Sequence, residues 1–206
     1  MLKILGRKTS SNVQKVLWVC GEIGLNFHRE DLGGPFGGNL EPEYLELNPN
    51  GVIPTIIDED FILWESNSCT RYLARKHSYG NLYPENLNIL ASAERWMDWQ
   101  LTVCSPSLVP VFRGLIRTPE KERNLREIQK SRNALSKSMF ILDKNLERNE
   151  YVAGASFTIG DIPVGIAAYR WYEMPIEREE YPNLKRWFDT LSSRPAFQDN
   201  VMQGLA

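Results

Sequence analysis

The chain has 206 residues, of which 42% are hydrophobic and 11% aromatic, and this suits a packed globular protein of one large or two small domains. Its formal net charge is -2 with acidic and basic residues interspersed, so we expect no nucleic-acid partner. No apolar run reaches the length of a membrane span and no signal peptide is evident, so we expect a cytoplasmic protein. Three cysteines without a Cys-X-X-Cys pair and only two histidines predict neither a disulfide framework nor a metal site.

The first third of the chain alternates predicted strands and helices. Apolar residues recur at helical spacing in some segments, whereas others are short β-rich runs bounded by turn formers. The order allows one parallel strand pair followed by an antiparallel pair, which predicts a small mixed sheet of four strands with helices around it. The expected elements are a strand at 2–6, a helix at 11–24, a strand at 27–30, a loop at 33–43, a short helix at 42–47, strands at 54–58 and 61–64, and a helix at 66–77.

The remainder of the chain is almost entirely helical in pattern. Residues 79–88 carry turn formers without periodicity and predict a linker between a domain at 1–78 and an all-helical domain at 89–206. Thr158 and Asp161 have the spacing of a capping box, in which Thr158 caps a helix and Asp161 reaches back to it. The expected helices are 89–116 with kinks at Pro106 and Pro110, 119–147 with Pro119 near its first turn, one starting near Thr158, and 182–193.

The most informative feature of the sequence is Ile53-Pro54, which lies between a turn at 48–51 and a β-rich run. Proline has no N–H to donate to a sheet, so it belongs at a strand start or edge. A cis peptide is common only before proline, and it can turn the preceding N–H and C=O outward. Ile53 and Pro54 therefore predict a backbone slot for a small peptide-like anion.

Four polar residues, Thr9, Ser10, Ser11 and Asn12, stand where the first strand leads into the first helix. Serine, threonine and asparagine are preferred helix caps, and capping alone would explain them. A hydroxyl beside the free N–H groups of the first turn can also donate a hydrogen bond to a bound thiolate and lower the thiol pKa. Because this turn is expected to face the slot at Ile53-Pro54, we favour the second interpretation.

Glu65-Ser66 opens the helix after the predicted hairpin. A serine at this position is usually only a cap. Free N–H groups and the helix dipole at this end also favour a bound carboxylate, while Glu65 can meet an ammonium group. That pairing fits the α-amino acid end of a ligand such as a γ-glutamyl group.

These motifs together resemble the cytosolic glutathione S-transferases over nearly the whole chain, and among them the bacterial theta-like members. The resemblance implies a thioredoxin-like N-terminal domain, an all-helical C-terminal domain and a homodimer. The motifs that carry it are the serine-containing turn before Val16-Leu17, Asn48-Pro49-Asn50-Gly51 leading into Ile53-Pro54, Glu65-Ser66 at a helix start, the linker near residue 80, and residues 156–162.

The resemblance also implies roles for individual residues. Ser10 matches the activating serine, with Asn12 beside the sulfur, and Thr9 or Ser11 could substitute for it. Ile53 would bind the cysteinyl backbone of glutathione, and Glu65 with Ser66 would hold its γ-glutamyl end. The other positions implied to face glutathione or the second substrate are Asn39, Val52, Pro54, Trp99 and Arg113.

The sequence thus predicts a glutathione transferase that ionises the thiol of its co-substrate glutathione, without a metal, for attack on a small hydrophobic electrophile or a peroxide. Two alternatives stay open: a glutathione-dependent disulfide or peroxide reductase, and a non-catalytic binding protein of the same fold. Val52 stands where many members have lysine, which favours the binding protein, whereas Ser10 and Glu65-Ser66 oppose it. No cysteine occupies the position of Ser10, which argues against a mixed-disulfide mechanism.

Overall fold

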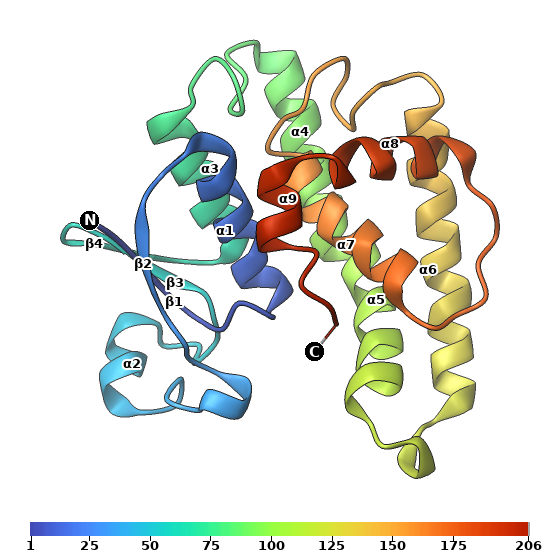
Figure 1. The fold of residues 1–206 in the computed structure, drawn as a ribbon, viewed down its shortest axis with the longest axis horizontal. Coiled ribbons are helices and arrows are strands. Elements are labelled where there is room, and N and C mark those ends of the chain that lie inside the picture. Colours follow the sequence, from blue (N-terminus) through green and yellow to red (C-terminus); the bar gives the residue numbers. More distant parts are fainter. Residues whose placement is uncertain (206) are drawn as a thin grey trace.

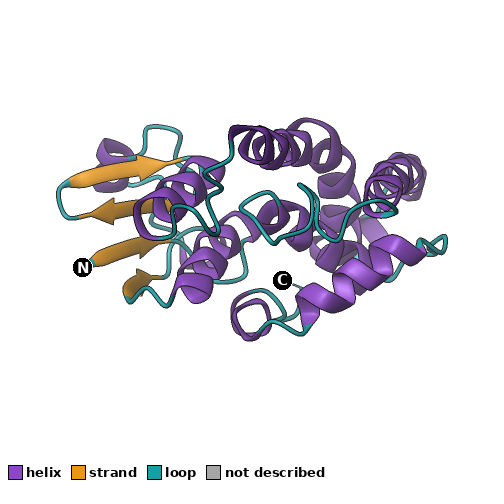
Figure 2. Cartoon of the chain, turned by 90° about the horizontal axis from the view of Figure 1, so that it is seen from above, coloured by secondary structure: helices purple, strands orange, loops and turns teal. Residues whose placement is uncertain are grey.

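A computed structural model describes residues 1–205 of the chain. Its N-terminal part contains one sheet with the strand order β2-β1-β3-β4, in which β1 runs parallel to β2 while β3 is antiparallel to both β1 and β4. This confirms the predicted mixed sheet, which lies at one end of the molecule (Figure 2). The strands are β1 (Leu2–Leu5), β2 (Phe27–Glu30), β3 (Thr55–Asp58) and β4 (Phe61–Trp64).

Helices α1 (Ser11–Ile23) and α3 (Ser66–His77) pack side by side against this sheet (Figure 1). The loop after β2 contains a 3₁₀ turn, η1 (Gly34–Phe36), and the short helix α2 (Pro42–Leu47). Helix α1 ends at Gly24, whose φ of 64° lets its N–H bond back to the carbonyls of Cys20 and Gly21. The βαβ–α–ββα order is therefore as predicted.

The C-terminal part consists of helices (Figure 1). Within the described residues 1–205, no helix is long and apolar enough to cross a membrane. In chain order the segments are α4 (Leu87–Trp99), the π-helical turn η2 (Gln100–Cys104), α5 (Ser105–Phe112), the π-helical turn η3 (Arg113–Arg117), the 3₁₀ turn η4 (Glu120–Glu122), α6 (Leu125–Leu146), α7 (Asp161–Glu173), α8 (Pro182–Ser192) and α9 (Pro195–Asn200).

The helical part differs from the prediction in three ways. The predicted helix at 89–116 is a helical run interrupted by the two π-helical turns, one of which directly precedes α5 and its Pro106. Helix α6 begins at Leu125 because Asn124 Oδ1 accepts a hydrogen bond from the N–H of Glu127 at 3.1 Å. Pro119 lies outside this helix in an extended conformation with ψ of 143°. Helix α9 was not predicted.

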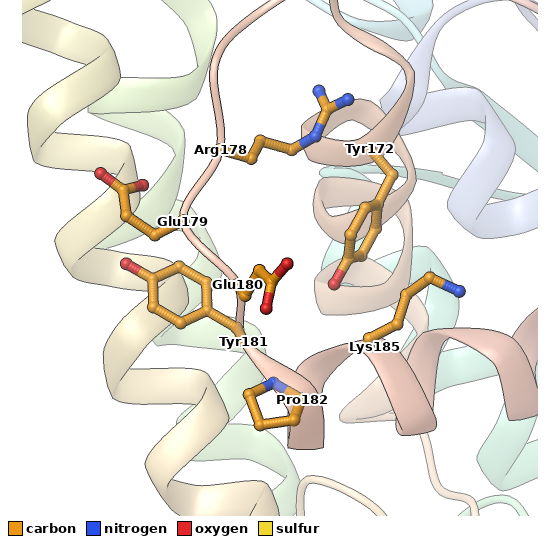
Figure 3. A pocket seen from close by; sticks show the side chains of 7 residues that line it. All are labelled: Tyr172, Arg178, Glu179, Glu180, Tyr181, Pro182 and Lys185. Atoms are coloured by element: carbon orange, nitrogen blue, oxygen red, sulfur yellow. The ribbon is translucent and has the colours of Figure 1, made fainter.

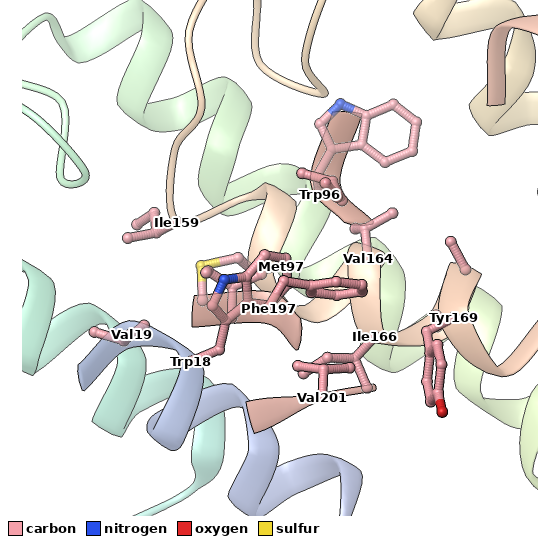
Figure 4. Packing of buried hydrophobic residues seen from close by; sticks show 14 of the residues in the cluster. Trp18, Val19, Trp96, Met97, Ile159, Val164, Ile166, Tyr169, Phe197 and Val201 are labelled. Atoms are coloured by element: carbon pink, nitrogen blue, oxygen red, sulfur yellow. The ribbon is translucent and has the colours of Figure 1, made fainter. Parts of the chain in front are cut away.

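The core extends from the N-terminal domain into the helical domain across α1. Trp18 of α1 packs against the ring of Phe197 with centroids 4.5 Å apart (Figure 4). The centroid of the Phe157 ring lies 5.6 Å from that of Trp18. Glu22, near the end of the same helix, forms an ion pair with Arg194 at 2.6 Å. Helix α1 is therefore held from both sides, and its N-terminus has a fixed position at the domain boundary.

Asp161 anchors the helical domain. Its Oδ1 accepts hydrogen bonds from the N–H of Val152 and from Trp187 Nε1, both at 3.0 Å. Its Oδ2 accepts from the N–H of Thr158 at 2.9 Å, and Thr158 Oγ1 accepts from the N–H of Gly160 at 3.3 Å. The predicted contact from Asp161 back to Thr158 is confirmed, and the same carboxylate also reaches a distant tryptophan. The prediction that Thr158 caps the helix was wrong, because α7 begins at Asp161 and Gly160 stands at its N-cap position. Burial raises the pKa of Asp161 to about 6 despite these hydrogen bonds.

Replacing Asp161 with alanine leaves four buried donors without their acceptor: the N–H groups of Val152 and Thr158, the Thr158 hydroxyl and Trp187 Nε1. We expect the free energy of unfolding at pH 7 to fall by about 2 kcal/mol or more. Urea denaturation measures this value. The matched control is Asp199→Ala, which removes an exposed carboxylate from α9. Equal stabilities of the two variants would contradict the anchoring role of Asp161.

Candidate active site

Ser10 stands at the boundary between the β1–α1 loop and α1. Its N–H donates to the carbonyl of Arg7 at 3.2 Å, and its own carbonyl accepts from the N–H of Gln14 at 2.8 Å. The Ser10 side chain makes no capping hydrogen bond to the helix, although its φ and ψ of -77° and 124° are typical of a cap. The geometry therefore does not support side-chain capping as the task of this hydroxyl, and its contact with sulfur stays a prediction.

A chain of hydrogen bonds joins the N-terminal turns of α1 and α3. Lys15 Nζ donates to Ser66 Oγ at 3.3 Å, and Ser66 Oγ donates to Asn12 Oδ1 at 3.2 Å. Lys15 is only 1% exposed and Ser66 only 5%. Two predicted site residues, Asn12 and Ser66, are thus hydrogen-bonded to each other, and Lys15, which was not predicted, also bonds to Ser66.

Lys15 is a buried amine with a perturbed charge state. Removal from water lowers its pKa to about 7, while the negative charge of Glu65 acts in the opposite direction. The positive charges of Arg170 and Arg71 also contribute to this lowering of the Lys15 pKa. Near neutral pH the amine therefore exists in both charged and neutral forms. The signal in the sequence was a lysine inside the apolar run at 13–20, all of which is buried.

Glu65 has a backbone conformation that residues other than glycine rarely adopt, with φ of 68° and ψ of 107°. It precedes the first residue of α3, Ser66, and its carbonyl accepts from the N–H of Cys69 at 2.9 Å. The Glu65 side chain is exposed. This conformation presents an accessible carboxylate beside the N–H groups of the first turn of α3, as the prediction of a γ-glutamyl site requires.

The peptide bond between Ile53 and Pro54 is cis. In the described part of the chain, the N–H and C=O of Ile53 take part in no backbone hydrogen bond. The loop before it is held rigidly, because the carbonyl of Val52 accepts from Tyr44 Oη at 2.6 Å and from Asn48 Nδ2 at 2.8 Å. The polar groups of Ile53 thus remain available beside β3, as the predicted slot requires.

Two further predicted positions have defined surroundings in this loop. Asn39 Nδ2 donates to the carbonyl of Gly51 at 2.6 Å, so this amide group holds the loop. The Val52 side chain is 52% exposed and points away from the core. Contacts of Asn39 and Val52 with a ligand stay predictions.

A cavity of about 200 Å³ lies between the two domains. Ser11, Asn12 and Lys15 of α1 form one side of it, and Gln100 of η2 and Arg170 of α7 form part of the other. Gln100 is buried, and its Oε1 has no hydrogen-bond partner among the described residues. The N-terminus of α1 therefore opens into a small chamber with both polar and apolar walls.

Trp99 and Arg113 are not among the residues that line this cavity. Trp99 packs against Trp96 with ring centroids 4.9 Å apart, and the side chain of Arg113 is exposed. The wall opposite α1 comes instead from the helical turns on either side of Pro106 and from α7. The expected contact of Trp99 and Arg113 with a second substrate gains no support from this geometry.

A second pocket of about 350 Å³ lies in the helical domain, where the α7–α8 loop turns back along α6 (Figure 3). All of its lining residues fall between Tyr172 and Lys185. Glu179 on its rim pairs with Arg132 at 2.8 Å and accepts from Ser136 at 2.7 Å, which fastens the loop to α6. This pocket shares no residue with the site at α1.

The three cysteines, Cys20, Cys69 and Cys104, are all free and buried. Burial raises the pKa of each thiol to about 12, so these groups are poor nucleophiles. They behave as the small hydrophobic residues that the sequence predicts. In residues 1–205 no group of His, Cys, Asp and Glu side chains is arranged to hold a metal ion.

The fold and this site define a class of protein: a thioredoxin-like domain with a serine at the first turn of α1, joined to a helical domain across a small cavity. Comparison with known proteins identifies the family. The family model described as the glutathione S-transferase N-terminal domain matches residues 9–76, and the model of the C-terminal domain matches residues 97–195.

Individual relatives agree with the family models. Glutathione S-transferase GstB of Escherichia coli (strain K12) is 35% identical over 98% of both chains. Glutathione S-transferase 3 of Zea mays is 31% identical over 97% of this chain and 93% of its own. The crystal structure of the theta class glutathione S-transferase from Xanthomonas axonopodis pv. citri with glutathione bound superposes with a TM-score of 0.97 at 42% identity, covering 100% of this chain and 99% of the other.

The chain belongs to the glutathione S-transferase family. The predicted fold, a thioredoxin-like domain followed by an all-helical domain, and the predicted enzyme class are thereby confirmed. Which residues of the site contact a ligand is not decided by these similarities.

Lys15 makes the stability of the protein depend on pH. Its pKa is near 7 in the folded protein and near 10.5 when unfolded, so the unfolded chain binds more protons between these values and stability rises with pH. In Lys15→Met this contribution is lost. We expect the free energy of unfolding of the wild type, relative to Lys15→Met, to increase by about 2 kcal/mol from pH 7 to pH 9.

Urea denaturation at several pH values measures this difference. Lys137→Met, which removes an exposed lysine from α6, serves as the control and should follow the wild type. Parallel curves for the wild type and Lys15→Met would show that Lys15 keeps its normal pKa.

Proposed function

We propose that the protein binds glutathione along the edge formed by Ile53-Pro54 and uses Ser10 to hold the sulfur as a thiolate for attack on a small electrophile. The observation that carries this proposal is the Ser10 hydroxyl, which makes no capping bond although it stands at the N-terminus of α1. A hydroxyl in that position can donate to a thiolate, and the positive end of the helix dipole favours the same anion. The similar Xanthomonas enzyme was crystallised with glutathione bound, which supports glutathione as the co-substrate here.

The rest of the tripeptide has matching partners in the N-terminal domain. The N–H and C=O of Ile53 would pair with the cysteinyl backbone, as a neighbouring strand does. Ser66 and the free N–H groups of α3 would bind the γ-glutamyl carboxylate, and the exposed carboxylate of Glu65 would bind its ammonium group. Lys15 and Asn12 hold the Ser66 hydroxyl between them at 3.3 and 3.2 Å, so this end of the site is positioned in advance.

The electrophile would enter the cavity between the domains, because Ser11 and Asn12 at its mouth adjoin the expected position of the sulfur. Ordinary thiols are only a few per cent ionised at pH 7, whereas lowering the pKa by about two units makes the thiolate the main form. Since the protein's own thiols are buried with raised pKa values, any reduction of a disulfide or peroxide at this site would depend on glutathione thiols.

We also propose a homodimer, in which a second copy covers strand β4. This strand is the edge of the sheet, and Phe61, Ile62 and Trp64 on it are 49%, 39% and 36% exposed. Exposed apolar edge strands are normally covered by a partner. A cytoplasmic location remains the expectation from the sequence.

Ser10→Ala tests the proposed thiolate contact. We expect kcat/KM for conjugation of 1-chloro-2,4-dinitrobenzene at pH 6.5 to fall by about tenfold or more, and the apparent pKa of the pH–rate profile to rise by about 1 to 2 units. The dissociation constant for glutathione, measured by calorimetry, should change by no more than about threefold, because the tripeptide is held mainly by its backbone and γ-glutamyl end.

Ser11→Ala is the matched neighbouring variant, and it should retain most of the turnover. Wild-type turnover in Ser10→Ala together with a loss in Ser11→Ala would transfer the role to Ser11. Absence of glutathione binding by the wild-type protein would refute the proposed function as a whole.

Phe61→Glu tests the proposed dimer. A charge placed in an apolar interface is costly, so we expect sedimentation to show mainly monomer at concentrations where the wild type is a dimer. Leu125→Glu introduces the same charge at a residue that is 69% exposed at the start of α6, and it should leave the dimer intact. A wild-type protein that sediments as a monomer would exclude this interface.

A further inference from the structure

The cavity between the domains holds a buried cation that has no acidic partner among residues 1–205. Arg170 of α7 is only 6% exposed and lines the cavity. Within residues 1–205 its guanidinium has no ion pair and no hydrogen bond, and the group lies over the face of the Phe112 ring, 3.9 Å from the guanidinium carbon to the ring centroid. A buried guanidinium normally pairs with an anion, because it has lost the water that would stabilise its charge.

In the described part of the chain, two further positive groups lie near Arg170. Arg7 and Arg117 lie close enough for their charges to lower the pKa of Arg170, and burial lowers it more, to about 10. At neutral pH the guanidinium therefore keeps its charge. Lys15 lies on the opposite wall of the same cavity and adds a further positive group when it is protonated. A cavity lined in this way has a positive potential and attracts anions.

Beyond these cations, the polar residues that line the cavity are Ser11, Asn12, Gln100 and Ser105. Gln100 Nε2 donates to Ser105 Oγ at 2.6 Å, whereas its buried Oε1 has no partner in the described part of the chain. A water molecule or a donor group on a ligand would satisfy this hydrogen-bond acceptor. The remaining wall is apolar, with Leu108 and Ile166 among the lining side chains. Ligand pockets usually measure about 300 to 1,000 Å³, so a cavity of about 200 Å³ suits a small molecule with a single ring.

We propose that this cavity selects electrophiles that carry a carboxylate, and that Arg170 is the residue that binds the carboxylate. The inference rests on the proposed function, because it places the thiolate at the mouth of the cavity beside Asn12. A planar guanidinium binds a carboxylate through two parallel hydrogen bonds, which fixes the orientation of the ring as well as its position. The electrophilic carbon of a para-substituted ring then faces the sulfur.

4-Chloro-3-nitrobenzoate has this arrangement, and its methyl ester is the neutral counterpart. In the reaction the glutathione sulfur bonds to the ring carbon that carries chlorine, and the carbon–chlorine bond breaks. Chloride leaves with the electron pair, and the thiol proton passes to solvent. No oxidant, reductant or further reactant is needed.

The experiment measures kcat/KM of the wild-type protein for both compounds, each divided by the rate constant of its uncatalysed reaction with glutathione. We expect the benzoate to be favoured by at least about tenfold, since the carboxylate replaces the missing partner of a buried charge. Benzoate should also inhibit conjugation competitively against the electrophile, and benzamide should not. A preference for the ester, or equal inhibition by benzoate and benzamide, would overturn the proposal.

Variants test whether Arg170 is the cause. In Arg170→Met the preference for the benzoate should fall to within about threefold of unity, whereas Arg170→Lys should keep part of it because the charge remains. Arg126→Met removes the same charge from an exposed position on α6 and should keep the wild-type preference. Should Arg170→Met fail to fold, Arg170→Lys and the inhibition measurements decide whether Arg170 binds the carboxylate. An unchanged preference in both Arg170 variants would overturn the assignment.

Glutathione calorimetry separates the two proposals. Binding of glutathione and conjugation of the ester, without preference for the benzoate, would refute only the carboxylate subsite. Failure to bind glutathione, together with no conjugation of either compound, would refute the proposed function and this inference with it.

Discussion

The packing of α1 between the sheet and the helical domain is the constraint on which the site depends. All residues from Val13 to Cys20 are buried, including two that are polar, Gln14 and Lys15. Trp18 fills the space between α1 and the C-terminal helices, and Glu22 is paired with Arg194. Because the helix cannot shift without opening both domains, its first turn stays in one position relative to the cavity.

The same burial gives Lys15 its unusual environment. A lysine at a domain boundary can normally extend its amine into water, but this one ends at Ser66 Oγ inside the protein. The cost of removing the amine from water is offset only in part by the charge of Glu65. In return, the N-terminal turns of α1 and α3 are tied together through Ser66 and Asn12. The two parts of the proposed glutathione site are thereby held in register by a group that itself need not touch the ligand.

Features that depend on neighbouring residues could be predicted from the sequence. The strands and the helices α1 and α3 follow from local periodicity. The contact of Asp161 with Thr158 follows from a capping pattern in which the two residues stand three positions apart. Ile53-Pro54 was also informative because its effect is local: a proline restricts the conformation of the peptide bond that precedes it. The predicted start of α6 at residue 119 was wrong, because Pro119 and Asn124 are both residues that favour the start of a helix. Arg123 holds the intervening segment through the carbonyls of Leu115 and Thr118, at 2.8 and 3.2 Å.

Features that depend on distant residues could not be predicted. Arg170 is one of several arginines in a helical pattern, and only the packing of α7 against α5 and η2 places it in a cavity. Trp99 was expected there because aromatic residues often line apolar pockets, yet its partner is Trp96. Helix α9 has six residues, which is too short for a periodic signal.

The π-helical turn at Gln100–Cys104 has a consequence for how this pocket can vary. It separates α4, which packs on α7, from α5, which packs mainly on α6 and also contacts α7. Gaining or losing one residue in such a turn rotates the side chains beyond it by about 100°. Relatives that differ by a single insertion at this point would therefore present a different set of side chains to their substrates while retaining the same bundle.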